Sequence, residues 1–332
     1  MFNKKNILVT GGTGSFGKAF VLHILKNYKP SKLVILSRDE LKQHEMKQDF
    51  ANKDKYKCLR FLLGDVRDKY RLKMAFKNMD YVIHAAAQKH VEYAEYNPQE
   101  CIKTNIDGAT NVIYACIENN VKKVIALSTD KAANPLNLYG ATKLVSDKLF
   151  IAANNISGKD STIFSVVRYG NVLNSRGSVI PYFKKLIDEG SDYLPLTHKD
   201  MSRFIISIKE GVNFVVDSLK DMRGGEIFVP KIPSILILDL IKALKKNIKI
   251  KTIGLKPGEK LSEVLCPSDE SLLTIEFKKY YIIMPTIETK VKKKLYFKSS
   301  NGEVGKLVKK GFEYNSAYEP KLSIDQIKKI LN

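Results

Sequence analysis

The chain has 332 residues, of which 44% are hydrophobic and 27% charged, and 56 Lys and Arg against 35 Asp and Glu give a formal net charge of +21. This composition is typical of a globular protein and excludes an intrinsically disordered chain. No apolar run approaches the roughly 18 residues that a membrane helix needs, and no nucleic-acid-binding motif accompanies the basic residues, so we expect neither a membrane protein nor a nucleic-acid partner.

The four cysteines and the N-terminus indicate a cytoplasmic protein without a metal site. The cysteines show no CxxC spacing, which predicts reduced thiols; they are Cys58, Cys101, Cys116 and Cys266. The N-terminal apolar run is too short for an export signal. The positive charge would attract an anionic small molecule.

The first element is a short apolar run at 6–10, which predicts a strand. A glycine-rich turn follows, and then a helical apolar pattern from Ala19 to Leu25. This order brings backbone N–H groups close to a pyrophosphate at a helix N-terminus. We therefore predict a dinucleotide site, with candidate contacts at Gly11, Thr13, Gly14, Ser15, Phe16 and Gly17.

The second predicted strand, at 33–36, ends in Ser37, Arg38 and Asp39. NAD enzymes usually place an acid first at this point to hold the ribose hydroxyls, whereas a guanidinium suits a 2′-phosphate. The pattern therefore favours NADP over NAD, with a surface arginine as the alternative.

Two further strands are predicted at 59–63 and 81–83, and the loops after them belong beside the cofactor. Asp65, Val66 and Ala85 lie in these loops. The small residues at 85–87 would allow a close approach, although an ordinary strand end explains them as well.

A helix at about 98–119 and a strand at 123–128 complete the alternation of strands and helices. This alternation predicts an α/β fold with a right-handed, doubly wound parallel Rossmann sheet. Catalytic groups in such sheets belong at the carboxyl ends of the strands, which is where the sequence STDKAANPLNLYGATK begins at Ser128.

Tyr139 and Lys143 are four residues apart and would share one face of a helix. The ammonium would lower the phenol pKa from about 10 and make Tyr139 a base for a sugar hydroxyl during hydride transfer. Thr129 could hydrogen-bond the same oxygen.

Asp130 and Lys131 are not needed by a simple alcohol dehydrogenase, but they suit an elimination that follows oxidation. A ketone at carbon 4 of a hexose acidifies the proton on carbon 5, whose loss expels the carbon-6 hydroxyl. Lys131 serves as base only if burial lowers its pKa, and Asp130 must stay protonated to serve as acid. These demands conflict unless burial dominates or a proton is relayed between the two groups. The alternative is a surface ion pair.

After Asn171 the alternation becomes irregular, with a loop at 174–178, a helix at 179–189, a strand at 225–230 that returns to the main sheet, and a C-terminal helix in the tail. We predict a cofactor-binding Rossmann domain at 1–172 with a returning segment near 207–232. Residues 173–332 form mainly a smaller, interleaved substrate-binding lobe and tail.

Several motifs together resemble the extended short-chain dehydrogenase/reductases. They are GGTGSFG, SRDELK, GDVRD, STDKAANP, YGATK, VVRYGN, SRGSV, GGEIFVPKIPS and PGEKL, spread over about 6–331. More narrowly, they resemble the configuration-inverting UDP-N-acetylglucosamine 4,6-dehydratases that open pseudaminic acid biosynthesis. Retaining dehydratases carry an acidic residue at the position of Lys131.

The resemblance implies an NADP-dependent lyase that oxidises carbon 4, eliminates water across carbons 5 and 6, returns the hydride to carbon 6 and inverts carbon 5. It implies Lys131 as base, Asp130 as acid and Tyr139 as redox base, with Lys143 holding Tyr139 and the ribose. It implies a homo-oligomer, a hexamer in the family, and a UDP-sugar partner. The implied contacts are Ser37, Arg38, Asp39, Glu40, Leu41 and Lys42 for the cofactor, and Lys89, Asn171, Arg203, Lys256 and Glu259 for the substrate.

These substrate contacts have simpler alternatives. Lys89 and Arg203 suit surface charges, Asn171 a strand-end turn and Glu259 a helix cap. Lys256 stands where the family has arginine, and lysine cannot grip phosphate in the same bidentate way. Departures from the family pattern at 92–93 and 197–200 leave the sugar substituents open. A retaining dehydratase, a carbon-4 epimerase and a cofactor-binding sensor without turnover remain the alternative functions.

Overall fold

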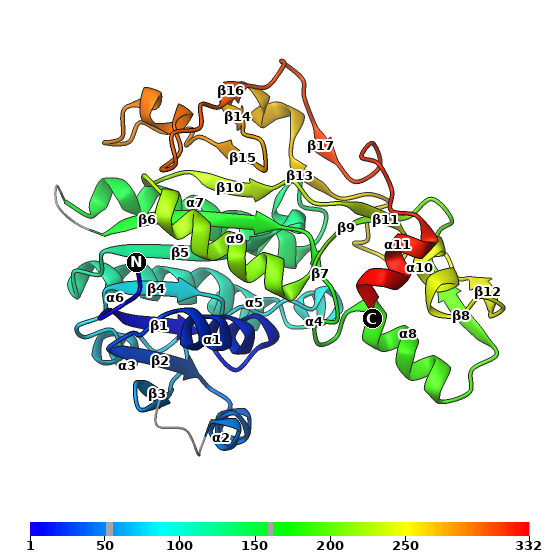
Figure 1. The fold of residues 1–332 in the computed structure, drawn as a ribbon, viewed down its shortest axis with the longest axis horizontal. Helices are drawn as coiled ribbons and strands as arrows, with labels where there is room; N and C mark the ends of the chain where they lie inside the picture. The colour runs from blue at the N-terminus through cyan, green and yellow to red at the C-terminus, as the bar shows by residue number, and fades with distance from the viewer. Residues whose placement is uncertain (51–55, 159–161, 332) are drawn as a thin grey trace.

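The computed structural model describes residues 1–50, 56–158 and 162–331, and its centre is a ten-stranded sheet (Figure 1). The strands are β1 (Asn6–Thr10), β2 (Lys32–Ser37), β3 (Leu59–Leu63), β4 (Tyr81–His84), β5 (Lys123–Thr129), β6 (Ile163–Tyr169), β10 (Ile227–Pro230), β14 (Thr274–Glu276), β15 (Tyr280–Ile283) and β16 (Lys306–Leu307). Their spatial order is β16-β14-β15-β10-β6-β5-β4-β1-β2-β3. Neighbours from β3 to β10 are parallel, which confirms the predicted doubly wound sheet, and β14–β16 add antiparallel strands.

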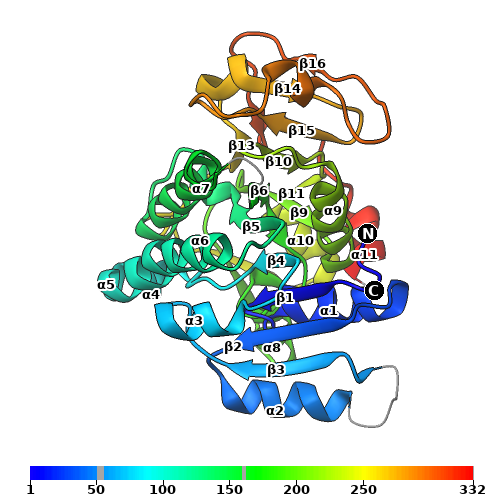
Figure 2. The same cartoon turned by 90° about the vertical axis from the view of Figure 1, so that its left-hand side faces the viewer.

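Helices cover both faces of this sheet (Figure 2). One face carries α1 (Ser15–Asn27) and α9 (Ile208–Asp221), and the other carries α3 (Lys69–Ala75), α6 (Gly108–Glu118) and α7 (Leu138–Ile156). The short helix α2 (Glu40–Asp49) lies beside the β3 edge. Because side chains alternate along a strand, Leu8 packs into one core while Ile7 and Val9 pack into the other. The buried runs of the parallel strands thus follow from having helices on both sides.

The single helix predicted at about 98–119 is wrong in detail, because it is interrupted. It consists of α5 (Pro98–Ile102), a π-helical turn η2 (Lys103–Asp107) and α6, and a further short helix, α4 (Val91–Tyr96), precedes it. The turn places Asn105 in the core, where its amide accepts from the Gln88 N–H at 2.8 Å, donates to the Gln88 carbonyl at 2.9 Å and donates to Thr142 Oγ1 at 3.0 Å. Asn105 therefore ties the loop after β4 to helix α7.

The second half builds a lobe of smaller sheets beside the carboxyl ends of the main strands (Figure 1). Its strands are β7 (Asn171–Val172), β9 (Ser202–Ile206) and β11 (Ser234–Leu236) in one sheet, β8 (Tyr193–Leu196) with β12 (Lys249–Thr252), and β13 (Val264–Cys266) with β17 (Tyr314–Asn315). Helices α8 (Val179–Asp188), α10 (Ile237–Leu244) and α11 (Ile324–Leu331) pack a separate core around Phe183, Leu240 and Ile327. The predicted helices at 179–189 and in the tail are thus present, and Asn332 lies outside the described residues.

The chain after 172 contributes to both parts of the molecule. Strand β10 pairs in parallel with β6, and β15 then pairs with β10, so the main sheet is completed by late segments. Two 3₁₀ turns, η4 (Ser268–Leu273) and η5 (Lys293–Phe297), flank these additions. The assignment of cofactor binding to 1–172 and substrate binding to the rest remains a prediction.

Within the described ranges, no helix is long and apolar enough to span a membrane, and no cluster of His, Cys, Asp and Glu is suited to a metal ion. All four cysteines have free thiols. Cys58 is half-exposed, whereas the prediction placed it in a buried pattern, because it precedes the edge strand β3.

Candidate active site

A cavity of about 750 Å³ opens at the carboxyl ends of the parallel strands. Most of the predicted cofactor and catalytic residues line it, although they come from many separate segments. The predicted residues on its wall are Gly11, Thr13, Gly14, Ser15, Phe16, Gly17, Ser37, Arg38, Asp39, Lys42, Asp65, Val66, Ala85, Lys89, Thr129, Lys131, Tyr139, Lys143 and Asn171. The fold therefore gathers these residues in one place.

The glycine turn has the geometry that a pyrophosphate site needs. Gly11 has φ +64°, and a Cβ there would lie 2.8 Å from the Ala86 nitrogen, so both the backbone angle and the space require glycine. Gly17 packs against Gly12 so closely that a Cβ would lie 2.5 Å from the Gly12 Cα. Helix α1 begins directly after Gly14, and its first turn, which carries unpaired N–H groups, lies on the cavity wall.

The loop after β2 presents one exposed guanidinium. Asp39 caps helix α2 by accepting from the Lys42 N–H at 2.9 Å, and its carboxylate also contacts the Lys42 ammonium. The Arg38 side chain is 60% exposed and lies 3.7 Å from Asp65, whose carboxylate is held more closely by Arg67 at 2.8 Å. The Asp39 carboxylate is thus paired with helix α2, while the Arg38 guanidinium is available to a ligand.

Glu40 and Leu41 belong to helix α2 and do not line the cavity, and Leu41 is 67% exposed.

Tyr139 and Lys143 lie one turn apart at the start of α7, which Asn137 caps, and both are buried. The predicted effect of Lys143 on the phenol is wrong for this state of the protein. Burial raises the pKa of Tyr139 to about 12, and Lys131 is the lysine that opposes this shift. Burial also lowers the pKa of Lys143, so its ammonium has a weaker hold on its proton.

A buried polar network that the sequence analysis missed supports this helix. Asp147, one turn after Lys143, accepts from Ser128 Oγ at 2.8 Å and lies 3.5 Å from the Arg168 guanidinium. Arg168 also pairs with Glu270 at 3.3 Å. Ser128 directly precedes the Thr129–Lys131 segment, so this network fixes both halves of the catalytic sequence relative to each other.

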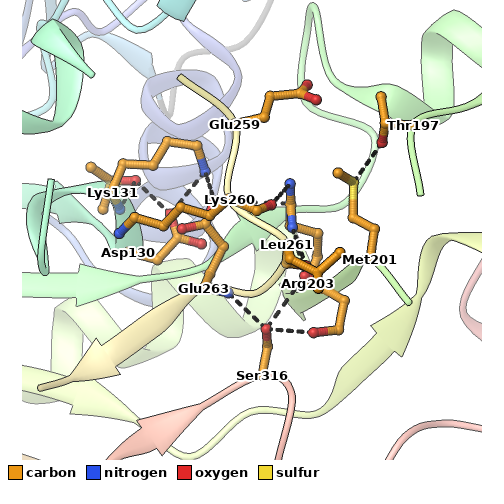
Figure 3. A network of polar contacts seen from close by, with 12 residues as sticks. Asp130, Lys131, Thr197, Met201, Arg203, Glu259, Lys260, Leu261, Glu263 and Ser316 are labelled. Atoms are coloured by element: carbon orange, nitrogen blue, oxygen red, sulfur yellow. Dashed lines mark hydrogen bonds and ion pairs between the residues drawn. The ribbon is translucent and has the colours of Figure 1, made fainter. Parts of the chain in front are cut away.

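Asp130 and Lys131 form the 3₁₀ turn η3 after β5, and their contact is not a surface ion pair (Figure 3). Asp130 is fully buried, and its Oδ1 lies 3.1 Å from Lys131 Nζ and accepts from Thr129 Oγ1 at 2.9 Å. Lys131 Nζ also donates to Glu263 Oε1 at 2.9 Å. Lys131 and Thr129 line the cavity, whereas Asp130 does not, so these two neighbours separate the Asp130 carboxyl group from the cavity.

The sequence left the protonation state of Lys131 open, and the charges around it in the structure decide it. Burial lowers the pKa of its ammonium, but Asp130 and Glu263 together outweigh burial and raise the pKa above its ordinary value. Lys131 is therefore held as a charged ammonium. Glu263 lies 132 positions from Lys131, so no local pattern linked the two residues.

Two of the five predicted substrate contacts, Lys89 and Asn171, line the cavity, and the other three do not. Lys89 donates to the Arg176 carbonyl at 2.8 Å, and burial and the nearby Arg176 lower its pKa. Asn171 lines the cavity beside it. Lys89 is thus tied to the loop at 174–178, which also reaches the glycine turn, because the Arg176 N–H donates to Ser15 Oγ at 3.4 Å.

The other three are placed differently. Arg203 is buried, and its guanidinium donates to the carbonyls of Ser202, Lys260 and Leu261, with Nε 3.9 Å from Glu263. Neither Lys256 nor Glu259 lines the cavity; they pair with each other in one turn, through the Lys256 N–H and Glu259 Oε2 at 3.4 Å. Figure 3 shows Glu259 apart from the Lys131 cluster.

Residues 7–285 match the family model described as polysaccharide biosynthesis protein. The chain is 59% identical over 320 residues to the inverting UDP-N-acetylglucosamine 4,6-dehydratase of Campylobacter jejuni subsp. jejuni, covering 96% of this chain and 95% of that one. It is 40% identical to a UDP-glucose 4-epimerase of Rickettsia bellii, covering 100% and 96%. The X-ray structure of Pen from Bacillus thuringiensis superposes with a TM-score of 0.90 at 37% identity, covering 100% and 98%.

Proposed function

Since the chain belongs to the polysaccharide biosynthesis protein family, we propose that it is an inverting UDP-N-acetylglucosamine 4,6-dehydratase, a hydro-lyase. The observation that carries this proposal is Lys131 on the cavity wall, paired with Asp130 and beside Tyr139. An epimerase needs the tyrosine but has no use for the Asp130–Lys131 pair. The 59% identity to a relative of that name supports the same reaction.

The cofactor that suits the glycine turn and helix α1 is NAD(P), and we favour NADP. Bound NAD(P) would supply the hydride acceptor for carbon 4 of the sugar and the hydride donor for carbon 6. Gly11 and the α1 N-terminus would hold the pyrophosphate, and exposed Arg38 would hold a 2′-phosphate, for which Asp39 leaves the space because it is paired with Lys42.

The chain's own residues move the protons. Tyr139 accepts the proton of the carbon-4 hydroxyl once it has given up its own phenolic proton, with Thr129 beside it and Lys143 one turn further along α7. Lys131 removes the carbon-5 proton once it has given up its own, and Asp130 supplies the proton that leaves with the carbon-6 hydroxyl. The product would be UDP-2-acetamido-2,6-dideoxy-β-L-arabino-hex-4-ulose, whose use in pseudaminic acid biosynthesis and flagellin glycosylation belongs to this proposal.

Time-resolved proton NMR with UDP-N-acetylglucosamine tests the reaction. A carbon-6 methyl doublet with inverted carbon 5 is the expected result, and a methyl with retained carbon 5 would assign the retaining reaction instead. No methyl, with a carbon-4 epimer present, would identify an epimerase. Lys131→Ala should fold and bind NADP yet give no 6-deoxy sugar, and substantial product from it would remove Lys131 from its role.

Two further properties belong to this proposal. We expect a homo-oligomer, with the hexamer that the family resemblance implies, and the exposed Tyr93 and Tyr96 on α4 offer apolar contact area for it. Sedimentation velocity would separate a hexamer from a monomer of 37.6 kDa. We also expect a cytoplasmic location, which fractionation of cells would test.

A further inference from the structure

Glu263 is a buried carboxylate that the proposed reaction does not use. Glu263 directly precedes β13 and is 1% exposed. Its Oε1 accepts a hydrogen bond from Lys131 Nζ at 2.9 Å (Figure 3). An ionised carboxylate is costly to bury unless it is paired. Lys131 therefore stabilises Glu263, and Glu263 in turn restrains Lys131.

The backbone around Glu263 is held tightly by the C-terminal segment. Its N–H donates to Ser316 Oγ at 2.9 Å, and its carbonyl accepts from the Ser316 N–H at 2.9 Å. Ser316 Oγ is in turn 2.9 Å from Ser202 Oγ, which belongs to β9. Segments that are distant in the sequence thus fix the backbone that carries the Glu263 carboxylate, so its position beside Lys131 is set by the fold.

One lysine requires only one carboxylate for charge balance, yet Lys131 has two. Asp130 Oδ2 and Glu263 Oε2 are both buried and have no hydrogen-bond partner among the described residues. The surplus carboxylate is balanced by Arg203, whose Nε lies 3.9 Å from Glu263 Oε1. Glu263 is therefore placed between the two cations, where its charge acts on Lys131 as well as on Arg203.

We propose that Glu263 is the positioning residue for Lys131: its buried carboxylate holds the ammonium against Asp130 and, through its charge, governs when that nitrogen is free of its proton. This inference rests on the proposed function, because it assumes that Lys131 exchanges a proton with the sugar. Glu263 itself does not line the cavity, so it acts through Lys131.

The groups that face Lys131 act in opposite directions. Asp130 from η3 and Glu263 from the β13 side raise its pKa, and burial and Arg203 from β9 lower it. Two more titratable groups face Lys131, namely Tyr139 from α7 and Lys260. The charge of Lys131 lowers the pKa of both. Replacing Glu263 by Gln keeps an oxygen at hydrogen-bond distance but removes one negative charge, so the pKa of Lys131 must fall.

The test measures the proton on Lys131 without using turnover. The amine reacts with acetic anhydride only when unprotonated, so acetylation of Lys131 is followed by peptide mass spectrometry from pH 7 to 10, relative to the exposed Lys246. We expect Lys131 to be acetylated about tenfold faster in Glu263→Gln than in wild type at a given pH, because a fall of one pKa unit raises the fraction of free amine tenfold. Equal rates in the two proteins would overturn the proposal.

A matched control and a second variant keep the result interpretable. Glu226 is as deeply buried, but its carboxylate accepts from the N–H groups of Arg223 and Gly224 at 2.6 and 2.7 Å and not from Lys131, so Glu226→Gln should leave the acetylation of Lys131 unchanged. If Glu263→Gln does not fold, Glu263→Asp retracts the same charge by one methylene and should still raise the rate. Acetylation of Lys131 that is equal in Glu263→Asp and wild type would then count against the proposal.

Turnover separates this inference from the proposed function. If wild type makes the 6-deoxy sugar, the limb of its pH–rate profile that reports loss of the Lys131 proton should move to lower pH in Glu263→Gln, and an unmoved limb would refute the positioning role alone. If wild type makes no product but acetylation responds to Glu263 as expected, the proposed reaction fails while the Glu263–Lys131 coupling stands.

Discussion

Lys131→Met should weaken the fold as well as stop the reaction, because the ammonium pairs with two buried carboxylates. Removing one partner of a buried ion pair costs about 3–5 kcal/mol. Lys131 is 23% exposed and Arg203 lies 3.9 Å from Glu263, so solvent and a second cation reduce this loss. We therefore expect the free energy of unfolding to fall by about 2–3 kcal/mol.

The sign of the pH dependence follows from the raised pKa of Lys131. A lysine whose folded pKa lies above the unfolded value of 10.5 contributes its full stabilisation below about pH 10.5 and loses it only above. The deficit of Lys131→Met should therefore be the same across about pH 7 to 9. Methionine is chosen because it keeps most of the aliphatic stem, so that lost packing contributes little.

Urea unfolding of wild type, Lys131→Met and the double variant Lys131→Met/Glu263→Gln measures this effect. The double variant lacks both the cation and one of the carboxylates, so it should recover about 1–2 kcal/mol relative to the lysine variant. A Lys131→Met protein within about 0.5 kcal/mol of wild type would show that the ammonium does not neutralise this cluster, and the argument for Glu263 would lose its electrostatic basis.

Three further predictions concern the surroundings of the site. A Cβ at Gly140 would lie 2.2 Å from the Lys131 carbonyl oxygen, so Gly140→Ala should lower the free energy of unfolding by about 1–3 kcal/mol, measured by thermal unfolding. The control is Gly211→Ala, whose Cβ would meet one side-chain atom at 4.0 Å and should leave stability unchanged or raise it. Arg38→Ala should lower the preference for NADP over NAD by about tenfold in equilibrium titrations, and an unchanged preference would remove Arg38 from 2′-phosphate binding. Since the pKa of Tyr139 is about 12, the ultraviolet difference spectrum between wild type and Tyr139→Phe should show no phenolate at pH 10, and a phenolate signal there would contradict the burial argument.

The fold of the N-terminal half was predictable because its signals are local. A strand, a glycine turn and a helix follow each other within 22 residues, and each step depends on neighbours in the chain. Tyr139 and Lys143 were likewise found from their spacing of one helical turn. The π-helical turn at 103–107 was not predictable, because it depends on hydrogen bonds from Asn105 to Gln88 and Thr142, which are distant in the sequence.

The charge state of the site could not be read from the sequence for the same reason. Asp130 and Lys131 are adjacent, but the pKa of Lys131 also depends on Glu263 and Arg203, which come from other segments. The sequence therefore suggested Asp130 and Lys131 as an acid and a base but left their protonation states open. For Tyr139, which packs against Ala94 and Cys101, burial outweighs the charge of Lys131, and this balance is also set by tertiary structure.

The four charges of the cluster explain how Lys131 can become a base despite its raised pKa. At rest, Asp130 and Glu263 balance Lys131 and Arg203. If one proton moves from Lys131 Nζ to Asp130 Oδ1 across 3.1 Å, the remaining charges are Glu263 and Arg203, and the net charge stays at zero. The product of this transfer is a neutral amine beside a protonated acid, which is the pair that an elimination needs. Because no net charge is created in the buried site, the transfer avoids the large cost of an uncompensated ion, and Arg203 remains beside Glu263 as its counter-ion.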